Sequence, residues 1–435
     1  MFSLQPCRAA KTATLLLLLL VVAGTTLPRD ADAAESKPSA AAKHALDEEA
    51  WSRLQELGEV SDANDNLERT FLSPASRRAM DKIAEWMRDA GMQTSVDEVG
   101  NVHGRVEGTA DPTAKALVIG SHLDTVKDAG KYDGALGIIV GIAAVKAMVL
   151  ESKASGIPIA RPVQVVAFCD EEGVRFSSTF LGSRALVGAI PEKVFAAKDA
   201  SGKTFLDALR DGGFKGTREA VATAALGDDS LGSYVEVHIE QGPVLESLGS
   251  PAAAVAGISG QTRISVSVYG TQGHAGTVPM TGRKDAVALS AKMISYVEDR
   301  CTTKEEEEEE DKDKKDTMLV CTVGDVRVWP GASNVISSNT NFSVDIRSQS
   351  DEERDVVVRD VVSAFRTACD SRGMRCDIDR NHDAAAVDCD ETITAGLKRA
   401  TELVHDDPPP NFGGGGGGGG KGRGGKGGGG AAAAT

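Results

Sequence analysis

The order of apolar and polar positions predicts a first domain in which strands alternate with helices. Residues 116–120 and 163–168 are short apolar runs, and residues 235–237 form a third short strand-like stretch. Helices are predicted over 74–90 and 134–151, each bounded by a proline or glycine signal. Apolar strands that alternate with helices indicate an α/β domain.

A different pattern begins near Gly257 and predicts an inserted α+β domain. Its predicted elements are a strand at 262–269, a helix at 285–298, strands at 319–328 and 341–347, and a helix at 352–369. This β-α-β-β-α unit spans about 115 residues, enough for a small domain. The first domain then resumes with a strand near Met374 and a helix at 392–404. The predicted boundaries are 35–256 for the first part of the α/β domain, 257–372 for the inserted domain and 373–412 for the second part of the α/β domain.

The N-terminus has the pattern of a secretory signal. Arg8 and Lys11 precede an apolar run at 14–25, and residues 31–33 form a small-x-small cleavage pattern. The apolar run is too short to span a bilayer, so residues 1–34 predict a signal peptide rather than a membrane anchor. No later segment is expected to be long and apolar enough to cross a membrane.

The overall charge argues against one class of function. The formal net charge of −16 argues against a nucleic-acid binder, which usually shows a basic face.

Two segments of the chain have low sequence complexity. Residues 304–316 contain six consecutive glutamates and predict a solvated acidic loop of the inserted domain. Residues 413–435 are almost all glycine and alanine, which predicts a disordered tail.

The cysteines do not predict a disulfide framework. They are scattered, without a CxxC pair, in a chain large enough to fold without such a framework. Cys169 ends an apolar run and is interpreted as a buried small residue rather than a nucleophile. Cys369 and Cys376 lie near enough in sequence to pair, and the sequence leaves their oxidation open.

Five short segments carry the candidate chemistry, because each places a histidine or a carboxylate beside a glycine. They are Gly120–Asp124, Gly130–Gly134, Asp170–Gly173, His238–Gly242 and Gly273–Gly276. Imidazole and carboxylate are ligands of borderline divalent ions, and two such ions can activate one water. In the α/β domain these residues fall at or just past the carboxyl ends of strands, where open sheets bind ligands. The joint presence of the segments predicts a two-metal hydrolase.

The residue types suggest a role for each metal-site side chain. Asp133 can bridge two ions with its two oxygens, while His122 and His238 complete the shell of one ion. Glu172 and one further residue would hold the other ion. Asp124, two residues after His122, is predicted to fix the imidazole tautomer from outside the metal shell.

Glu171 is predicted to be the general base. Two adjacent carboxylates after an apolar strand need a cation or solvent, and Glu172 is already assigned to a metal. Glu171 is therefore free to take a proton from the attacking water and pass it to a leaving nitrogen.

Three residues of the inserted domain suit a small anionic substrate. His274 lies on a turn of small residues, and Asn334 follows Ala332-Ser333 in a second turn. Histidine and asparagine side chains can stabilise an oxyanion. Arg347 ends a predicted strand and can grip a carboxylate with two hydrogen bonds, although a surface position explains it equally well from sequence alone.

Longer motifs around these residues indicate a family. They are Ser121–Val126, Asp128–Gly134, Asp170–Phe176, Phe180–Ser183, His238–Glu246, Gly260–Arg263, Gly273–Met280, Asn334–Ile336 and Asp345–Arg347. Over about residues 45 to 405 the chain resembles the amidase/hydantoinase/carbamoylase branch of the M20 metallopeptidase-like superfamily. The resemblance implies an α/β metallohydrolase domain with an inserted α+β lid and dimerisation domain.

The resemblance also implies cofactors, partners and residue roles. It implies two Mn²⁺ ions per subunit, a small ureide substrate, and a homodimer formed through the lid, whose histidine can serve the partner's active site. Plant-type members act in the endoplasmic reticulum, consistent with the predicted signal. The implied metal ligands are His122, Asp133, Glu172 and His238, the implied base is Glu171, and the implied substrate-binding residues are His274, Asn334, Arg347 and Gln241.

The implied activity is hydrolysis of allantoate to ureidoglycine, ammonia and carbon dioxide, a step of ureide and purine catabolism. Gly260–Arg263 and His274–Met280 are more similar to allantoate-hydrolysing members than to ureidoglycolate-hydrolysing ones. The alternatives are an N-carbamoyl-L-amino acid hydrolase, a ureidoglycolate amidohydrolase, and an inactive truncated paralogue.

The chain also departs from the family pattern. A complete member carries a Gly-Ala-Gly-His-Asp-type loop and a last metal-binding histidine downstream, and neither His382 nor His405 lies in such a motif. We therefore expect the second ion to lack one ligand in the chain as given, and we expect this chain to be inactive.

Overall fold

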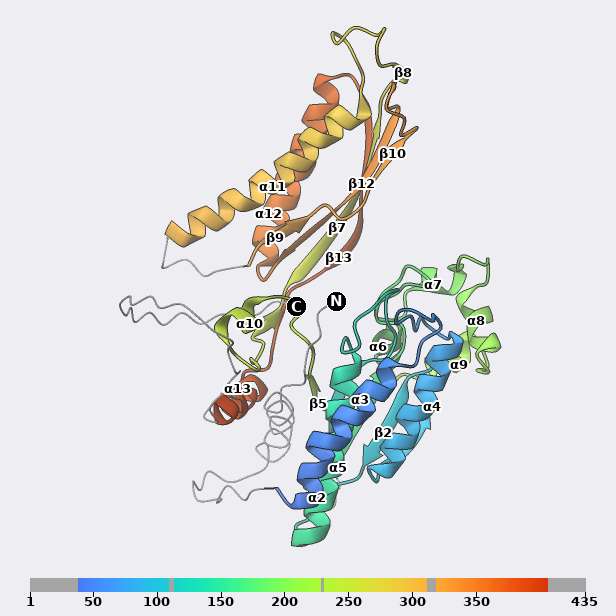
Figure 1. The fold of residues 1–435 in the computed structure, drawn as a ribbon, viewed down its shortest axis with the longest axis vertical. Coiled ribbons are helices and arrows are strands. Elements are labelled where there is room, and N and C mark those ends of the chain that lie inside the picture. Colours follow the sequence, from blue (N-terminus) through green and yellow to red (C-terminus); the bar gives the residue numbers. More distant parts are fainter. Residues whose placement is uncertain (1–37, 109–112, 228–230, 311–317, 406–435) are drawn as a thin grey trace, which may run out of the picture. The chain divides into compact units, whose positions relative to one another are not determined.

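The described chain forms two compact units, which are considered separately (Figure 1). The computed structural model describes residues 38–108, 113–227, 231–310 and 318–405. The first unit contains the described residues up to Ala254 and from Ala395 onward, and the second unit is Val255–Thr394. The predicted signal peptide at 1–34 and the predicted tail at 413–435 lie outside the described residues.

The first unit is built on a mixed five-stranded sheet with strand order β1-β2-β4-β3-β5. Its strands are β1 (Gln93–Val96), β2 (Val102–Val106), β3 (Ala116–His122), β4 (Val163–Phe168) and β5 (Leu231–Glu236). β3 lies between β4 and β5 and is parallel to both, whereas β2 is antiparallel to β4 and β1. The carboxyl ends of three parallel neighbours therefore meet at one edge.

Helices cover both faces of this sheet. The helical elements of the first unit are α2 (Ala40–His44), the π-helix η1 (Ala45–Glu49), α3 (Ala50–Gly58), α4 (Pro74–Asp89), α5 (Ala135–Ser155), α6 (Leu181–Leu186), α7 (Glu192–Ala196), α8 (Phe205–Asp211), α9 (Arg218–Ala222) and α10 (Val244–Leu248), with most of α13 (Glu391–His405). α5 packs on β3 and β4, while Leu186 of α6 joins Val118 and Val166 on the opposite face. α4 begins as predicted, with Ser73 capping Ser76 N and proline in the first turn.

One expectation about membrane spans was wrong. α5 is long and apolar enough to cross a membrane by length and composition. However, 67% of its most apolar stretch is buried inside the structure, because α5 packs against β3, β4, α3 and η1. Its continuous apolar sequence reflects contact with neighbours on most sides.

The second unit is an antiparallel sheet with strand order β10-β12-β7-β13, to which β9 adds beside β12. Its elements are β6 (Gly257–Ile258), β7 (Gly260–Tyr269), β8 (Gly273–His274), α11 (Ala286–Glu310), β9 (Val320–Thr322), β10 (Val326–Trp329), β11 (Val335–Ile336), β12 (Asn339–Ser348), α12 (Asp351–Ser371), β13 (Arg375–Ala384) and β14 (Val387–Asp388). Buried and solvent-facing residues alternate along β7 and β12. α11 and α12 lie together on the buried face, as Figure 1 shows.

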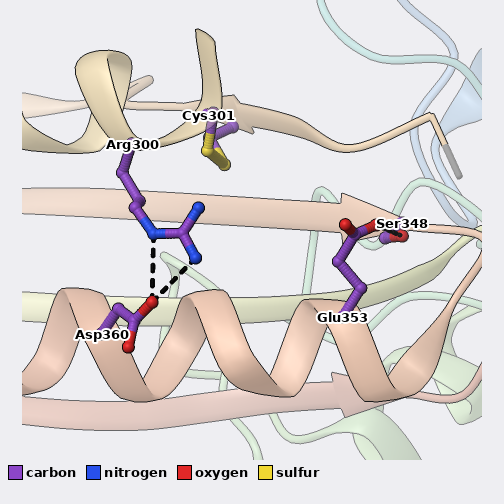
Figure 2. The surroundings of a disulfide bond; sticks show 6 residues. Arg300, Cys301, Ser348, Glu353 and Asp360 are labelled. Atoms are coloured by element: carbon purple, nitrogen blue, oxygen red, sulfur yellow. Dashed lines mark hydrogen bonds and ion pairs between the residues drawn. A yellow bond between two sulfur atoms is a disulfide. The ribbon is translucent and has the colours of Figure 1, made fainter. Parts of the chain in front are cut away.

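Two disulfides reinforce the second unit. Cys369–Cys376, which the sequence left open, joins the end of α12 to β13. Cys301–Cys321, which the sequence reasoning missed, joins α11 to β9 across a separation of 20 residues. Figure 2 shows the neighbouring pair in which Arg300 of α11 donates two hydrogen bonds to Asp360 of α12. The disulfide and this ion pair hold α11 from two directions.

The structure differs from the sequence prediction in three places within this unit. β13 pairs with β7, so residues 375–384 lie in the second unit and not beyond the predicted boundary at 372. The predicted strand at 319–328 is two strands, β9 and β10, interrupted around Gly324. α11 continues to Glu310, so the acidic run begins as helix rather than loop, and its remainder at 311–316 lies outside the described residues. Strand pairing and helix length depend on contacts distant in sequence, which local patterns do not contain.

Candidate metal centre

The three parallel strands of the first unit deliver the predicted metal-site residues to one place. His122 is the last residue of β3, and Glu171 and Glu172 follow β4. His238 lies two residues after the end of β5, and Asp133 lies on the loop that leads into α5. Ligand atoms of His122, Asp133 and His238 all lie within 4.8 Å of one another, as do those of His122, Glu171 and Glu172.

Backbone carbonyls orient both imidazole rings of the centre. Nδ1 of His122 donates to the Asp124 carbonyl at 2.9 Å, and Nδ1 of His238 donates to the Ile239 carbonyl at 2.8 Å. In a neutral ring the other nitrogen, Nε2, is then a lone-pair donor toward a metal. The two Nε2 atoms lie 3.5 Å apart, and they lie 3.4 and 3.2 Å from Oδ1 of Asp133.

This arrangement fits a divalent cation. Two imidazole lone pairs and a carboxylate oxygen converge, and Asp133 Oδ1 is buried without a hydrogen bond of ordinary geometry in the described chain. Such a cluster is repulsive unless a proton or a metal lies within it. Mixed imidazole and carboxylate donors suit several first-row ions, so the geometry fits a metal without selecting one.

The pKa shifts of His122, His238 and Asp133 also indicate that the centre favours a positive charge. Burial opposes protonation of His122, but its contact with Asp133 and the charges of Asp124 and Glu171 raise its pKa to about 10. The contact with Asp133 likewise raises the pKa of His238 against the effect of burial. The two histidines hold the pKa of Asp133 well below its usual range. A bound cation would replace the protons that this cluster otherwise attracts.

Asp124 orients His122 through its backbone carbonyl rather than through its carboxylate. Its carboxylate lies 4.0 Å from His122 Nδ1, and it is the Asp124 backbone carbonyl that fixes the ring. The carboxylate instead accepts hydrogen bonds from the backbone N–H groups of Glu171 and Glu172, at 2.9 and 3.1 Å. Asp124 therefore joins the loop after β3 to the loop after β4, and it positions both glutamates.

Glu171 is a half-buried carboxyl whose pKa is raised. Burial raises its pKa to about 7, with His122 opposing the rise and the charges of Glu172 and Asp124 adding to it. Burial also raises the pKa of Glu172. A base with a pKa near neutrality can accept a proton and release it again at the same pH.

A glycine lets the Asp133 loop approach His122. Gly134 has φ +62°, and a Cβ at this position would lie 2.3 Å from the His122 carbonyl oxygen and 2.5 Å from its Nδ1. Any side chain would push the two loops apart, so the glycine in the Gly130–Gly134 segment is required for the centre to form.

Gln241 also reaches the centre. Its side-chain amide donates to Oδ2 of Asp133 at 2.8 Å, from a backbone with φ 57°. The structure thus places Gln241 beside the predicted bridging carboxylate, which is a suitable position for contact with a small substrate.

The remaining predicted residues lie in the second unit. His274 of β8 pairs with Val335 of β11, and Ala275 N donates to the Asn334 carbonyl at 2.9 Å, so His274 and Asn334 are neighbours. Nδ1 of His274 accepts a hydrogen bond from Gly276 N at 3.1 Å, which leaves Nε2 as a donor on an exposed ring.

Arg347 lies on β12 of the five-stranded sheet, whereas His274 belongs to the separate two-stranded sheet of β8 and β11. Arg347 pairs with Gln261 near the start of β7, whereas His274 follows the end of β7 at Tyr269. Tyr269 lies eight positions after Gln261 along the strand, about 26 Å away at the usual rise of a β-strand. Within one chain His274 and Arg347 are therefore too far apart to touch the same small molecule.

Comparison with known proteins decides the family. A family model described as Peptidase family M20/M25/M40 matches residues 118–420. The chain belongs to this family. It is 48% identical to Allantoate deiminase 1 of Glycine max over 362 residues, which cover 82% of this chain and 74% of that protein.

More distant members of the family are also similar. An N-carbamoyl-L-amino acid amidohydrolase of Geobacillus stearothermophilus is 35% identical over 354 residues, covering 81% of this chain and 82% of that protein. A hydantoinase/carbamoylase family amidase from Burkholderia ambifaria has a similar structure, with a TM-score of 0.67, 32% identity and 82% of each chain covered. The predicted family and the predicted fold, an α/β domain with an inserted sheet domain, are confirmed.

One residue beside Arg347 was not identified from the sequence. Asp345 receives hydrogen bonds from Arg347 at 3.1 Å, from Arg263 at 3.2 Å and from Gln261 at 2.7 Å. Asp345 precedes Arg347 by two positions, so both project from the same side of β12. That spacing is the signal that could have identified Asp345 as the residue that orients the guanidinium.

Proposed function

We propose that this protein, when the second ion has its full set of ligands, is an allantoate deiminase, a metal-dependent amidohydrolase that converts allantoate to ureidoglycine, ammonia and carbon dioxide in purine catabolism. The observation that carries the proposal is 48% identity to a plant allantoate deiminase over 82% of the chain. The convergence of His122, Asp133 and His238 supplies a centre suited to that chemistry.

We propose manganese as the metal, with His122, Asp133 and His238 around one ion and Glu172 on a second. When bound, such ions polarise a substrate oxygen and make a water more acidic. Glu171 removes the proton from the attacking water at its carboxylate and delivers it to the leaving nitrogen. Cleavage of the terminal carbon–nitrogen bond releases ammonia, and the carbamate that remains loses carbon dioxide to give the amine.

Substrate recognition is assigned to Gln241, His274, Asn334 and Arg347. Arg347 presents a planar guanidinium, oriented by Asp345, that matches the carboxylate of a ureide acid. Nε2–H of His274 and the amide of Asn334 can donate to the developing oxyanion.

We further propose a homodimer formed through the second unit. The separation of His274 from Arg347 along β7 supports it, because one small substrate can use both residues only when they come from different chains. Activity assays on a mixture of two single-site variants test this arrangement. Inactive His274→Ala and Arg347→Ala proteins should regain activity when mixed, because mixed dimers hold one intact site.

A location in the secretory pathway, in the endoplasmic reticulum, is supported by the N-terminal pattern and by the two disulfides. Imaging of a fusion that keeps residues 1–34 tests this location. A cytosolic signal would contradict it.

The central test is ammonia release from allantoate, ureidoglycolate and N-carbamoyl-L-amino acids with added Mn²⁺. The proposal requires allantoate to have the highest kcat/KM. The 35% identity to an N-carbamoyl-L-amino acid amidohydrolase makes that activity the second candidate. Turnover of none of them, with fewer than two ions bound per chain, would favour the inactive paralogue.

A further inference from the structure

Arg69 is a buried cation behind the metal centre, and the functional roles assigned so far do not use it. Its side chain has 0% exposed surface. Nε donates to the Leu123 carbonyl at 2.8 Å, and Nη1 donates to the carbonyls of Leu57 at 2.9 Å and Val60 at 3.2 Å. A buried guanidinium lowers the stability of the fold unless its N–H groups are hydrogen-bonded. The burial of Arg69 therefore calls for a structural or functional explanation.

The anchor of Arg69 is the carboxyl end of α3. Leu57 lies in the last turn of this helix and Val60 just beyond it, at the helix end whose carbonyls carry partial negative charge. Burial lowers the pKa of Arg69 to about 10, against the opposing charges of Asp124 and Asp62, so the group is charged at neutral pH. A guanidinium can bind three carbonyls at once, because it has five donors in a fixed plane.

Arg69 also contacts the loop that runs from His122 to Asp133, through the carbonyl of Leu123. Leu123 stands between the predicted ligand His122 and Asp124, whose carboxylate holds the backbone of Glu171 and Glu172. A shift of the Leu123 carbonyl would therefore move groups on both loops of the centre.

The backbone around Arg69 extends the same contact along the loop. Arg69 N donates to Oγ1 of Thr125 at 2.9 Å, and Thr125 N donates to the Arg69 carbonyl at 3.1 Å. Two residues away, Ala129 N donates to the Leu67 carbonyl at 3.0 Å. Residues 67–69 thus run beside 125–129, the stretch that joins His122 to Asp133.

We infer that Arg69 is a positioning residue for the metal centre, which ties the loop from His122 to Asp133 to the end of α3. Lys131, near the other end of this loop, forms an ion pair with Glu59, which directly follows α3. The loop is therefore joined to the end of α3 at two points, through Leu123 and through Lys131. The inference depends on the metal centre and not on which ureide is the substrate.

The test measures metal affinity directly. Full-length wild-type, Arg69→Lys and Arg69→Met proteins are stripped of metal and titrated with Mn²⁺ by calorimetry, without substrate, after circular dichroism has established that each is folded. The matched control is Arg354→Met. Arg354 lies in the second unit, is 4% exposed, and also donates to a backbone carbonyl, that of Ala384 at 3.1 Å.

The inference requires Arg69→Met to bind Mn²⁺ about 10–100-fold more weakly, the usual effect of losing a group that supports metal ligands. Arg69→Lys should fall between this variant and wild type, because a point charge cannot serve three carbonyls in a plane. Arg354→Met should lose thermal stability but keep the wild-type Mn²⁺ affinity. If Arg69→Met is folded and binds Mn²⁺ like wild type, the inference is overturned.

A milder pair of variants covers the case in which Arg69→Met does not fold. Thr125→Val removes the acceptor of Arg69 N, and Thr125→Ser keeps it. Thr125→Val should weaken Mn²⁺ binding several-fold, and Thr125→Ser should restore it. Equal affinity of both with wild type would overturn the inference. Allantoate hydrolysis does not enter these measurements, so failure of the proposed substrate would be seen separately.

Discussion

The two units hold their functional residues in different ways. In the first unit, His122, Asp133 and His238 are half-buried or buried, and each imidazole ring is fixed by a hydrogen bond to a backbone carbonyl of its own loop. In the second unit, His274 is exposed and Arg347 is half-buried, and both lie on or beside the solvent-facing side of a regular sheet. The first arrangement concentrates charge, and the second presents donors to a ligand.

The two units also differ in their covalent cross-links. Both disulfides of the described chain join elements of the second unit, whereas Cys169 of the first unit is a buried thiol. Burial raises the pKa of Cys169 well above its usual value, which makes it a poor nucleophile, as predicted. The difference indicates that changes in the first unit should affect metal binding and chemistry, while changes in the second should affect substrate binding and local stability.

The largest effect should come from the general base of the first unit. Glu171→Gln should lower kcat by about 10²–10⁴-fold and leave metal content unchanged, because it removes proton transfer and no ligand. Metal analysis and steady-state rates on an active preparation measure this. Glu85→Gln, on the exposed side of α4, is the control. Loss of metal from Glu171→Gln would make Glu171 a ligand instead.

The disulfide that closes the longer loop should matter for the second unit alone. Replacing Cys301 and Cys321 together by serine should destabilise that unit by about 2–4 kcal/mol, because the cross-link restricts the unfolded chain. Calorimetry should show an early transition for the second unit, while the Mn²⁺ affinity of the first unit is unchanged. A parallel loss of Mn²⁺ affinity would mean that the two units do not respond separately.

Arg347→Lys should weaken the contact with substrate. We expect a loss of about 1.5–3 kcal/mol in kcat/KM, carried mostly by KM, because an ammonium cannot reproduce the planar fork. Arg327→Lys, an exposed arginine of the neighbouring β10, is the matched control. Unchanged kinetics in Arg347→Lys would place this residue outside the substrate site.

The folding stability of the metal-free protein should depend on pH because ionisable groups are clustered in the first unit. The pKa of His122 is raised from 6.5 to about 10, so its contribution to stability is complete below pH 6.5 and is lost as pH rises toward 10. The pKa of Glu171 is raised from 4.5 to about 7, so its ionisation also costs stability as pH rises from 4.5 to 7.

Both shifts have the same sign, so the metal-free protein should become less stable as pH increases. We expect a loss of about 1 kcal/mol between pH 7 and pH 8, the range in which about one proton distinguishes the folded from the unfolded chain. Denaturant unfolding in the presence of a chelator measures it. Added Mn²⁺ should reduce this loss, because the ion replaces the protons. Stability that rises with pH in the chelator would contradict the assignment.

Much of this protein follows from its sequence, for identifiable reasons. The runs ending at His122 and Phe168 are apolar because they lie in a sheet covered on both faces, and such runs can be recognised locally. The side chains that follow them gather at one edge because parallel strands share a direction, so the meeting of His122, Asp133 and His238 was predictable.

The tertiary structure alone decided the rest. The residues of β13 are exposed or half-buried, and only the pairing of this strand with β7 assigns it to the second unit. The Cys301–Cys321 pairing, the exchange of roles between the carbonyl and the carboxylate of Asp124, and the burial of Arg69 depend on segments that meet across long stretches of chain. Local residue patterns record which groups can bind a metal or pack in a core. Which partner each group receives is fixed by packing between distant segments, which no local pattern contains.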